Sequence, residues 1–201
     1  MKIAVLTGSI ASGKSTAATL YRKQGVPIID CDQIAKKQSS LGGISYYMIR
    51  LFFGKSVLNE DKSINRAKLG SIIFNDPQKR ALLNHITHPF VKMAIVFQLI
   101  KYFIMLKTLV IVDVPLFFEV NMDKSWLFAR STVILVSVRD DLQKQRLMAR
   151  NSFTDEEATS RINSQIPVKE KEARSHIVLR NDKTVDDLND QIIESMVTLT
   201  Q

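Results

Sequence analysis

The sequence predicts an α/β fold, a three-layer sandwich of helices around a five-stranded parallel sheet, on two observations. Apolar, β-prone segments alternate with longer helical segments, which is typical of parallel sheets. The segments "IAVL", "LVIV" and "VILVSV" are apolar throughout, as expected for strands covered by helices on both faces. The predicted strands are 2–7, 27–31, 109–114, 132–138 and 176–180; the predicted helices are 14–24, several within 33–105, one near 123–129, several within 141–173, and 184–199.

Composition and charge narrow the function classes. The 201 residues are enough for one compact domain with a sizeable core. The net charge of +8 suits anionic partners, but the basic residues form no run, so we expect small phosphorylated molecules rather than nucleic acid. Cys31 is the single cysteine and "MKIAVLT" lacks a signal-peptide layout. We therefore expect a cytoplasmic protein without an internal disulfide, a monomer or a weak homo-oligomer.

The apolar stretch 93–118 raises the question of a membrane span. Lys101, Lys107 and Asp113 interrupt it, and Pro115 follows. A spanning helix needs about 20 apolar residues with few charges. We predict a buried helix, a turn near 107–108 and a buried strand, with contact at a membrane surface left open.

The segment "GSIASGKS" follows the first strand and precedes the first helix. Its glycines Gly8 and Gly13 let successive N–H groups point inward at a helix N-terminus, where phosphate binds. In this G-x-x-x-x-G-K-S pattern Lys14 reaches the β- and γ-phosphates and Ser15 ligates Mg²⁺. The alternative is a glycine turn that only caps the helix. The pattern predicts a phosphate-binding (P-) loop; the expected nucleotide-binding residues are Gly8, Ala11, Ser12, Gly13, Lys14, Ser15 and Thr16.

Three acidic residues at the ends of two predicted strands accompany this loop. Asp113 closes the strand "VIVD" and is either a second Mg²⁺ ligand or a solvated strand end. Asp30 and Asp32 end the second strand, where period-2 alternation places them on one side. Either one is a base for a substrate hydroxyl, a Mg²⁺ ligand or a helix cap. No N-K-x-D-like guanine reader follows a later strand, which argues against a GTPase.

Arg146 and Arg150 are four residues apart on a predicted helix and share one face. Guanidinium groups on a closing lid stabilise the charge of a transferring phosphoryl group. The alternative is a solvated face, because acidic residues lie nearby in the sequence.

"LTGSIASGKST", "VPIIDCDQIA", "THPFV" and "VDVPLFFE", at these spacings, resemble the dephospho-CoA kinase family over nearly the whole chain. The resemblance implies transfer of the ATP γ-phosphate to the ribose 3′-hydroxyl of dephospho-CoA with Mg²⁺. It implies a catalytic set of Asp32, Lys14, Arg146 and Arg150, with Asn181 near the adenine of ATP. The implied substrate-binding residues are Asp32, Arg66, His88, Pro115, Leu116, Glu119, Arg161 and Gln165, and Lys171 matches a lysine of the family.

The chain departs from the family pattern at several positions. Cys31 stands between the two aspartates where alanine is usual, and Phe117 and Phe118 replace smaller apolar residues. The segment "SHIVLRND" lacks the usual Ala-Asp before the strand and the glycine after the asparagine.

Other candidates keep two interpretations. His85 and His88 have i, i+3 spacing but no third ligand nearby, so we expect ordinary helix residues, and Pro89 should end or kink their helix. Trp126 is expected in the core rather than as a base-stacking platform. Arg66 faces either the acceptor's phosphates or water.

We expect these parts to form a single kinase domain. Its core is 1–32, 107–139 and 175–201, its helical substrate-binding part is about 33–106, and its lid is about 140–174. The rival interpretations are a kinase for another small molecule, such as a nucleoside monophosphate, a nucleotide-dependent switch without an acceptor, and a degenerate homologue with a scaffold role.

Overall fold

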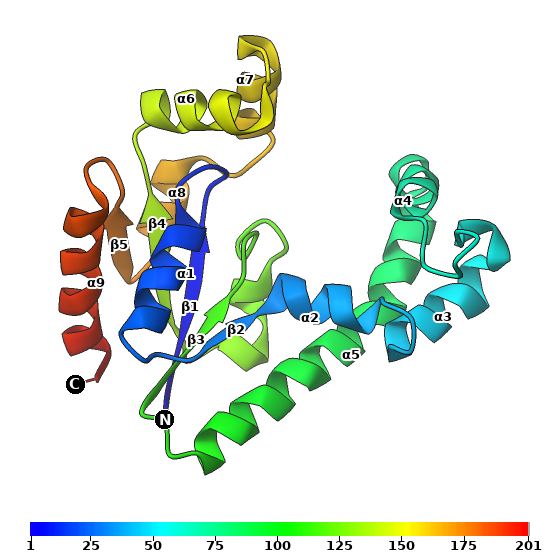
Figure 1. Cartoon of the computed structure of the whole chain (residues 1–201), viewed down its shortest axis with the longest axis horizontal. Coiled ribbons are helices and arrows are strands. Elements are labelled where there is room, and N and C mark those ends of the chain that lie inside the picture. The colour runs from blue at the N-terminus through cyan, green and yellow to red at the C-terminus, as the bar shows by residue number, and fades with distance from the viewer. Residues whose placement is uncertain (201) are drawn as a thin grey trace. The chain divides into compact units, whose positions relative to one another are not determined.

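A computed structural model describes residues 1–200 of the chain (Figure 1). These residues divide into two compact units. The first consists of residues 1–29 and 102–200, and the second of residues 30–101. Each unit has a hydrophobic core of its own.

The first unit contains a five-stranded parallel sheet, which confirms the predicted fold class. Its strands are β1 (Lys2–Gly8), β2 (Ile28–Asp30), β3 (Leu109–Asp113), β4 (Thr132–Ser137) and β5 (Ile177–Arg180). The strand order is β2-β3-β1-β4-β5, and Val5 in the central strand pairs with Val112 on one side and Val133 on the other. The phosphate-loop segment therefore leaves the central strand of the sheet.

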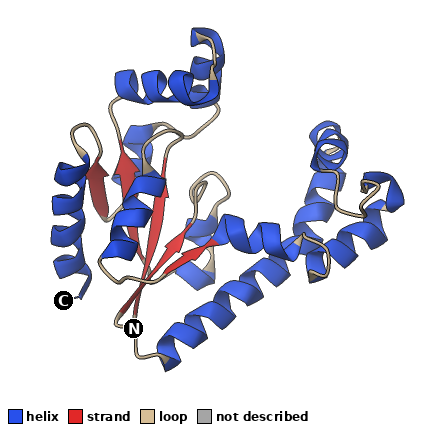
Figure 2. Ribbon diagram, viewed as in Figure 1, coloured by secondary structure: helices blue, strands red, loops and turns tan. Residues whose placement is uncertain are grey.

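Helices cover this sheet (Figure 2). The helices of the first unit are α1 (Lys14–Lys23), α6 (Asp140–Asn151), α7 (Asp155–Asn163), α8 (Val168–Ala173) and α9 (Val185–Thr200). Side chains of α1 and α9, including Tyr21 and Leu188, form one core with Leu6 of β1. The alternate strand residues, such as Val5 and Val112, are also fully buried, so the opposite face of the sheet is covered as well.

The second unit is helical. Its helices are α2 (Cys31–Gln38), α3 (Ile44–Phe53), α4 (Arg66–Asn75) and α5 (Pro77–Ile104), and α5 runs on into the first unit. Ile49, Val57, Leu69 and Ile86 form its buried cluster. The apolar residues of this part of the chain thus pack among themselves.

Pro89 does not end its helix, which was one of the two predicted outcomes; a kink at Pro89 stays a prediction. α5 runs without interruption from Pro77 to Ile104. A proline inside a helix removes one hydrogen bond to the preceding turn. The 28-residue helix nevertheless continues on both sides of Pro89.

The apolar stretch 93–106 is not the buried helix that we predicted. Ile95 and Leu99 are buried, but Phe97 and Phe103 are each 63 % exposed. A helix turns its side chains in all directions, so one packed face leaves the others open. Among the described residues, no helix combines the length and the apolar character needed to cross a bilayer.

The segment 123–129 also differs from the prediction. It forms two 3₁₀ turns, η2 (Met122–Lys124) and η3 (Trp126–Phe128), instead of one α-helix. Trp126 is 76 % exposed, so its assignment to the core was wrong, whereas Phe128 is buried. A three-residue turn has only one inward position, and Phe128 occupies it.

Candidate active site

The segment between β1 and α1 has the geometry of a phosphate-binding loop. β1 ends at Gly8 and α1 begins at Lys14. Between them Ala11 and Gly13 have left-handed φ angles of 58° and 89°, and the Ser12 N–H donates to the Ser9 carbonyl at 3.1 Å. The predicted strand–loop–helix context is confirmed, and α1 begins directly where the loop ends.

Both motif glycines are required by their surroundings. A Cβ atom at Gly8 would lie 2.9 Å from the carbonyl oxygen of Val136 in the neighbouring strand β4. A Cβ at Gly13 would collide with the side-chain amide of Asn181, and the positive φ of Gly13 also disfavours any L side chain. Any larger residue would force the loop away from β4 and from Asn181.

Lys14 and Asp113 form an ion pair across the start of α1 and the end of β3. The two side chains are 18 % and 8 % exposed. The alternative that Asp113 is a solvated strand end is therefore wrong. The pair brings the phosphate-binding lysine and the candidate Mg²⁺ ligand to one place.

Four side chains from the last third of the chain contact the loop, three at its backbone and one at the Ser9 hydroxyl. Gln143 Nε2 donates to the Ile10 carbonyl at 2.9 Å, and the Ile10 N–H donates to Gln165 Oε1 at 2.9 Å. Asn181 Nδ2 donates to the Ser12 carbonyl at 2.8 Å. Lys171 Nζ donates to Ser9 Oγ at 3.3 Å. The loop conformation is thus supported by residues that lie more than 130 positions away in the sequence.

Lys171 also connects the loop to the "VDVPLFFE" segment. Its side chain is 1 % exposed, and its Nζ lies 2.5 Å from Glu119 Oε1. Charges are buried this deeply only when they are paired. In this unit Glu119 and Gln165, both implied as substrate-binding residues, support the loop directly or through Lys171.

Pro115 and Leu116 follow β3 at the same edge of the sheet. The Pro115 carbonyl accepts a hydrogen bond from Thr7 Oγ1 at 3.2 Å, and Leu116 is 43 % exposed. An exposed leucine beside a phosphate loop offers an apolar contact to a ligand.

The arginines of the segment 140–174 divide into two groups. Arg174 pairs with Asp123 and Glu170 at 2.5 and 3.2 Å. These carboxylates, with the hydrogen bonds they accept, raise the pKa of Arg174. By contrast, Arg146, Arg150 and Arg161 form no ion pair with any described residue.

Three acidic residues near these arginines in the sequence have other partners. Asp155 binds Lys144 at 2.6 Å and Asp141 binds Arg139 at 3.1 Å. Glu157 completes a capping box with Thr154 at the start of α7. The guanidinium groups of Arg146, Arg150 and Arg161 therefore keep their charge available for an anion.

Asp30 and Asp32 have different roles in the second unit. Asp30 caps α2, because its side chain accepts from the Gln33 N–H at 2.9 Å. Helix α2 begins at Cys31, earlier than expected, so strand alternation does not extend to Asp32. Cys31 is buried and Asp32 is exposed in the first helical turn. Asp30 is therefore the helix cap, and the Asp32 carboxylate is exposed at the first turn of α2.

The remaining candidates of the second unit lie on its surface. Arg66 Nη2 donates weakly to Ser39 Oγ at 3.4 Å. Partial burial, and then the charge of Lys92, lower the pKa of His88, so its imidazole is neutral at neutral pH. No group of three or more His, Cys, Asp or Glu side chains with metal-site geometry occurs in residues 1–200, and His85 with His88 is not such a group.

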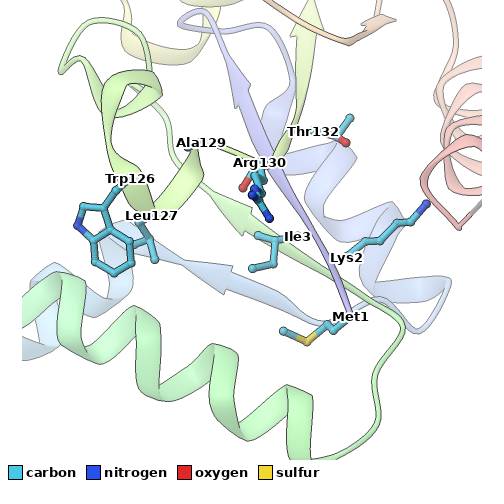
Figure 3. A pocket seen from close by; sticks show the side chains of 9 residues that line it. Met1, Lys2, Ile3, Trp126, Leu127, Ala129, Arg130 and Thr132 are labelled. Carbon is cyan, nitrogen blue, oxygen red and sulfur yellow. The ribbon is translucent and has the colours of Figure 1, made fainter.

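A cavity of about 580 Å³ opens at the other end of the sheet (Figure 3). Met1, Lys2 and Ile3 at the start of β1, and Thr132 at the start of β4, line it together with Trp126. The phosphate loop follows the carboxyl end of β1 and contributes none of these residues. This cavity is separate from the phosphate-binding region.

Gln143 contacts the loop although no sequence pattern indicated it. It lies on the same helix as Arg146 and is 1 % exposed. Gln143 is itself polar and stands between Leu142 and Lys144, so no local pattern marks it as buried. The one sequence signal was spacing: Gln143 lies three residues before Arg146, and this spacing places both on one face of a helix.

The parallel sheet, the loop after its central strand and the Lys14–Asp113 pair define a P-loop nucleotide-binding protein of the small-molecule kinase type. A shikimate kinase from Bacteroides thetaiotaomicron shares this fold, with a TM-score of 0.51 over 100% of this chain and 99% of that one. Its sequence is only 16% identical, so the similarity concerns the fold alone.

The chain belongs to the dephospho-CoA kinase family. The sequence profile of that family matches residues 2–187. The dephospho-CoA kinase of Lactobacillus johnsonii is 43% identical over 187 residues, which cover 93% of this chain and 92% of that protein. The structure of dephospho-CoA kinase from Campylobacter jejuni superposes with a TM-score of 0.73 at 28% identity, over 100% and 98% of the two chains.

Proposed function

We propose that this chain transfers the γ-phosphate of ATP to the ribose 3′-hydroxyl of dephospho-CoA, which yields coenzyme A and ADP. This is the last step of coenzyme A synthesis. The observation that carries the proposal is the complete loop Gly8–Ser15 with its Lys14–Asp113 pair, in a chain that matches the dephospho-CoA kinase family over residues 2–187. The net charge of +8 suits two polyanionic substrates.

The loop and the start of α1 bind the ATP phosphates in this proposal. The backbone N–H groups around Gly13 and the N-terminus of α1 supply positive potential, and Lys14 contacts the β- and γ-phosphates. Asn181, whose amide already bonds the loop at the Ser12 carbonyl, lies on the adenine side of the nucleotide. Gly8, Ala11 and Thr16 complete the nucleotide-binding set.

The Ser15 hydroxyl and the Asp113 carboxylate would hold Mg²⁺. Mg²⁺ prefers oxygen ligands and is commonly bound by one or two protein groups together with substrate phosphates and waters. Ser15 is exposed at the first turn of α1, and Asp113 lies beside Lys14, so the donor types fit the ion. When bound, Mg²⁺ neutralises charge on the β- and γ-phosphate oxygens.

Asp32 is the proposed base. Its carboxylate accepts the proton of the 3′-hydroxyl as that oxygen forms a bond to the γ-phosphorus. The bond between the γ-phosphorus and the bridging oxygen breaks, and ADP leaves with that oxygen. The capping role of Asp30 and the exposure of Asp32 support the choice of Asp32 over Asp30.

Arg146 and Arg150 stabilise the transferring phosphoryl group. Phosphoryl transfer distributes negative charge over three oxygens, and arginine side chains lower its energy at close range. Neither arginine forms an ion pair with a described residue, which supports this role. In this proposal residues 140–174 act as a lid over the phosphates, and residues 33–106 bind the acceptor.

The acceptor itself is assigned to the polar and apolar side chains that the family resemblance implies. Arg66 and Arg161 bind its phosphates, and a neutral His88 offers a hydrogen bond rather than a charge. Leu116 supplies an apolar contact beside Pro115, and Glu119 completes the set, whereas Gln165, whose Oε1 accepts from the Ile10 N–H, is assigned to the loop instead. We further propose that the protein acts in the cytoplasm as a monomer or a weak homo-oligomer.

The position of the new phosphate tests this proposal. Purified protein is incubated with MgATP and dephospho-CoA, and the product is analysed by mass and by ³¹P NMR. We expect one added phosphate, on the ribose 3′-oxygen, and no product from an acceptor analogue that lacks the 3′-hydroxyl. Phosphate at another oxygen, or turnover of the 3′-deoxy analogue, would contradict the assignment.

A further inference from the structure

Two glutamines bind the same residue of the phosphate loop from opposite sides of its backbone. The Ile10 carbonyl accepts from Gln143 Nε2, and the Ile10 N–H donates to Gln165 Oε1, each at 2.9 Å. Gln143 is on α6 and Gln165 follows α7. Both glutamines belong to residues 140–174, the proposed lid. The N–H and C=O groups of Ile10 are thus both hydrogen-bonded within the protein. The N–H is therefore not available to donate to a phosphate.

The burial of Gln143 is costly unless its contact with the loop has a use. The side chain is 1 % exposed, and its Oε1 is buried without a partner among the described residues. A buried polar atom without a hydrogen bond destabilises a protein. An apolar side chain of equal length would avoid this cost at the same site. Such an apolar side chain could not donate a hydrogen bond to the Ile10 carbonyl.

Gln143 shares a helix face with the two candidate arginines. Arg146 lies three residues further along α6 and Arg150 seven, so the three side chains follow one stripe of the helix. Leu147, which is fully buried, fixes the rotation of the same helix. A bond from Gln143 to the loop therefore fixes the distance between the loop and the stripe on which Arg146 lies.

We infer that Gln143 and Gln165 are positioning residues, which set Arg146 against the phosphate loop through their bonds to Ile10. They touch neither ATP nor the acceptor. The inference rests on the proposed phosphoryl transfer, in which Arg146 acts on the transferring group. A misplacement of about 1 Å can cost about 100-fold in rate, so the loss of one of these bonds is expected to be visible in kcat.

The test uses Gln143→Met, which retains the length of the side chain and removes both polar atoms. We expect kcat for dephospho-CoA to fall by about 10- to 100-fold, with the Kd for ATP changed by less than about twofold. The melting temperature should change little, because removal of the unpartnered oxygen offsets the loss of the hydrogen bond to the Ile10 carbonyl. Gln145→Ala, at an exposed position of the same helix, is the control and should leave all three quantities unchanged.

A double-mutant cycle with Arg146→Ala then identifies the route of the effect. If Gln143 acts through Arg146, the double variant is about as slow as Arg146→Ala alone. Multiplied losses, or a lower melting temperature that accounts for the lost rate, would overturn the inference. So would full activity of Gln143→Met.

Hydrogen exchange supplies a readout that needs no acceptor. Gln165→Met should increase the exchange rate of the Ile10 amide, because that N–H loses its partner. Unchanged exchange there would contradict the inference even if the chain phosphorylates dephospho-CoA. A wild-type protein with no turnover of dephospho-CoA but with this exchange response would instead refute the proposed function and leave the glutamine contacts standing.

Discussion

Lys14 in the phosphate loop and Asp113 at the end of β3 are joined by an ion pair with little access to solvent. In the proposed mechanism, the phosphates of the nucleotide compete with Asp113 for the Lys14 ammonium. The Asp113 carboxylate would then be free to hold Mg²⁺, so we expect nucleotide binding and Mg²⁺ binding to be coupled.

Asp113→Asn is expected to weaken the binding of Mg²⁺. Asparagine retains the size of the side chain but loses the charge that holds the cation. We expect kcat to fall at least about tenfold and the half-saturating Mg²⁺ concentration to rise, since a charged ligand is worth several kcal/mol in such sites. A Mg²⁺ titration of ADP formation measures both. Asp186→Asn, at an exposed position of α9, should match the wild type. A Mg²⁺ curve for Asp113→Asn that overlays the wild type would remove Asp113 from the metal site.

Asp32→Asn should retain ATP binding and lose turnover. General base catalysis typically contributes about 10²–10⁴-fold, so we expect a loss of at least about 100-fold in kcat. Calorimetric ATP binding and steady-state turnover are measured side by side. Asp30→Asn is the matched control: asparagine caps helices as well as aspartate does, so α2 and turnover should both be preserved. Near-normal turnover in Asp32→Asn would show that Asp32 is not the base.

Lys171→Met should destabilise the protein. Lys171 is 1 % exposed and is paired with Glu119 at 2.5 Å. Removal of one partner of a buried pair leaves the other charge uncompensated, which costs about 3–5 kcal/mol. Urea unfolding measures the loss, and the double variant Lys171→Met/Glu119→Gln should recover part of it. No recovery in the double variant would mean that the pair with Glu119 is not what the lysine contributes.

Tyr21 should make stability fall in alkaline solution. Burial raises the pKa of Tyr21 from its ordinary 10.0 to about 12, while its hydrogen bond with Ser195 acts in the opposite direction. The folded state keeps the phenolic proton to higher pH than the unfolded state. The contribution of Tyr21 is therefore complete below pH 10 and is lost as the pH rises toward 12, by roughly 2–3 kcal/mol.

Chemical unfolding between pH 9 and 12 measures this effect. Tyr21→Phe should flatten the decline, and Ser195 remains satisfied in that variant because its Oγ also donates to the Ile192 carbonyl at 2.7 Å. Tyr47→Phe, at a half-exposed ring, should decline like the wild type. An equal alkaline slope in Tyr21→Phe would assign the loss to other groups.

The sequence predicted the parts of this molecule that depend on local pattern. The apolar strands, the glycine-framed loop and the order of elements follow from periodicity and from the conformational demands of Gly8 and Gly13, and the structure confirms them. The exposure of Trp126 and the continuity of α5 could not be predicted from the sequence. Local composition does not determine which side of a short turn or a long helix packs against the rest of the protein.

The side chains that contact the phosphate loop from distant parts of the chain were even harder to predict from the sequence. Gln143 and Lys171 contact the loop from more than 130 residues away, and a single sequence carries no record of such pairs. The capping role of Asp30 was one of three open alternatives, because an Asp that caps a helix and an Asp that ends a strand with a base or metal-binding role give the same pattern. The residue at which α2 begins decides between these roles. Such helix boundaries are difficult to predict from sequence to within one or two residues.

ADP release from MgATP by the purified protein, with and without dephospho-CoA, tests the central claim most directly. AMP, CMP and shikimate serve as competing acceptors, and Lys14→Ala as the inactive control. We predict ADP release that requires dephospho-CoA, yields coenzyme A in equal amount, and disappears in Lys14→Ala. Release that is indifferent to dephospho-CoA, or that occurs only with another acceptor, would contradict the proposed function.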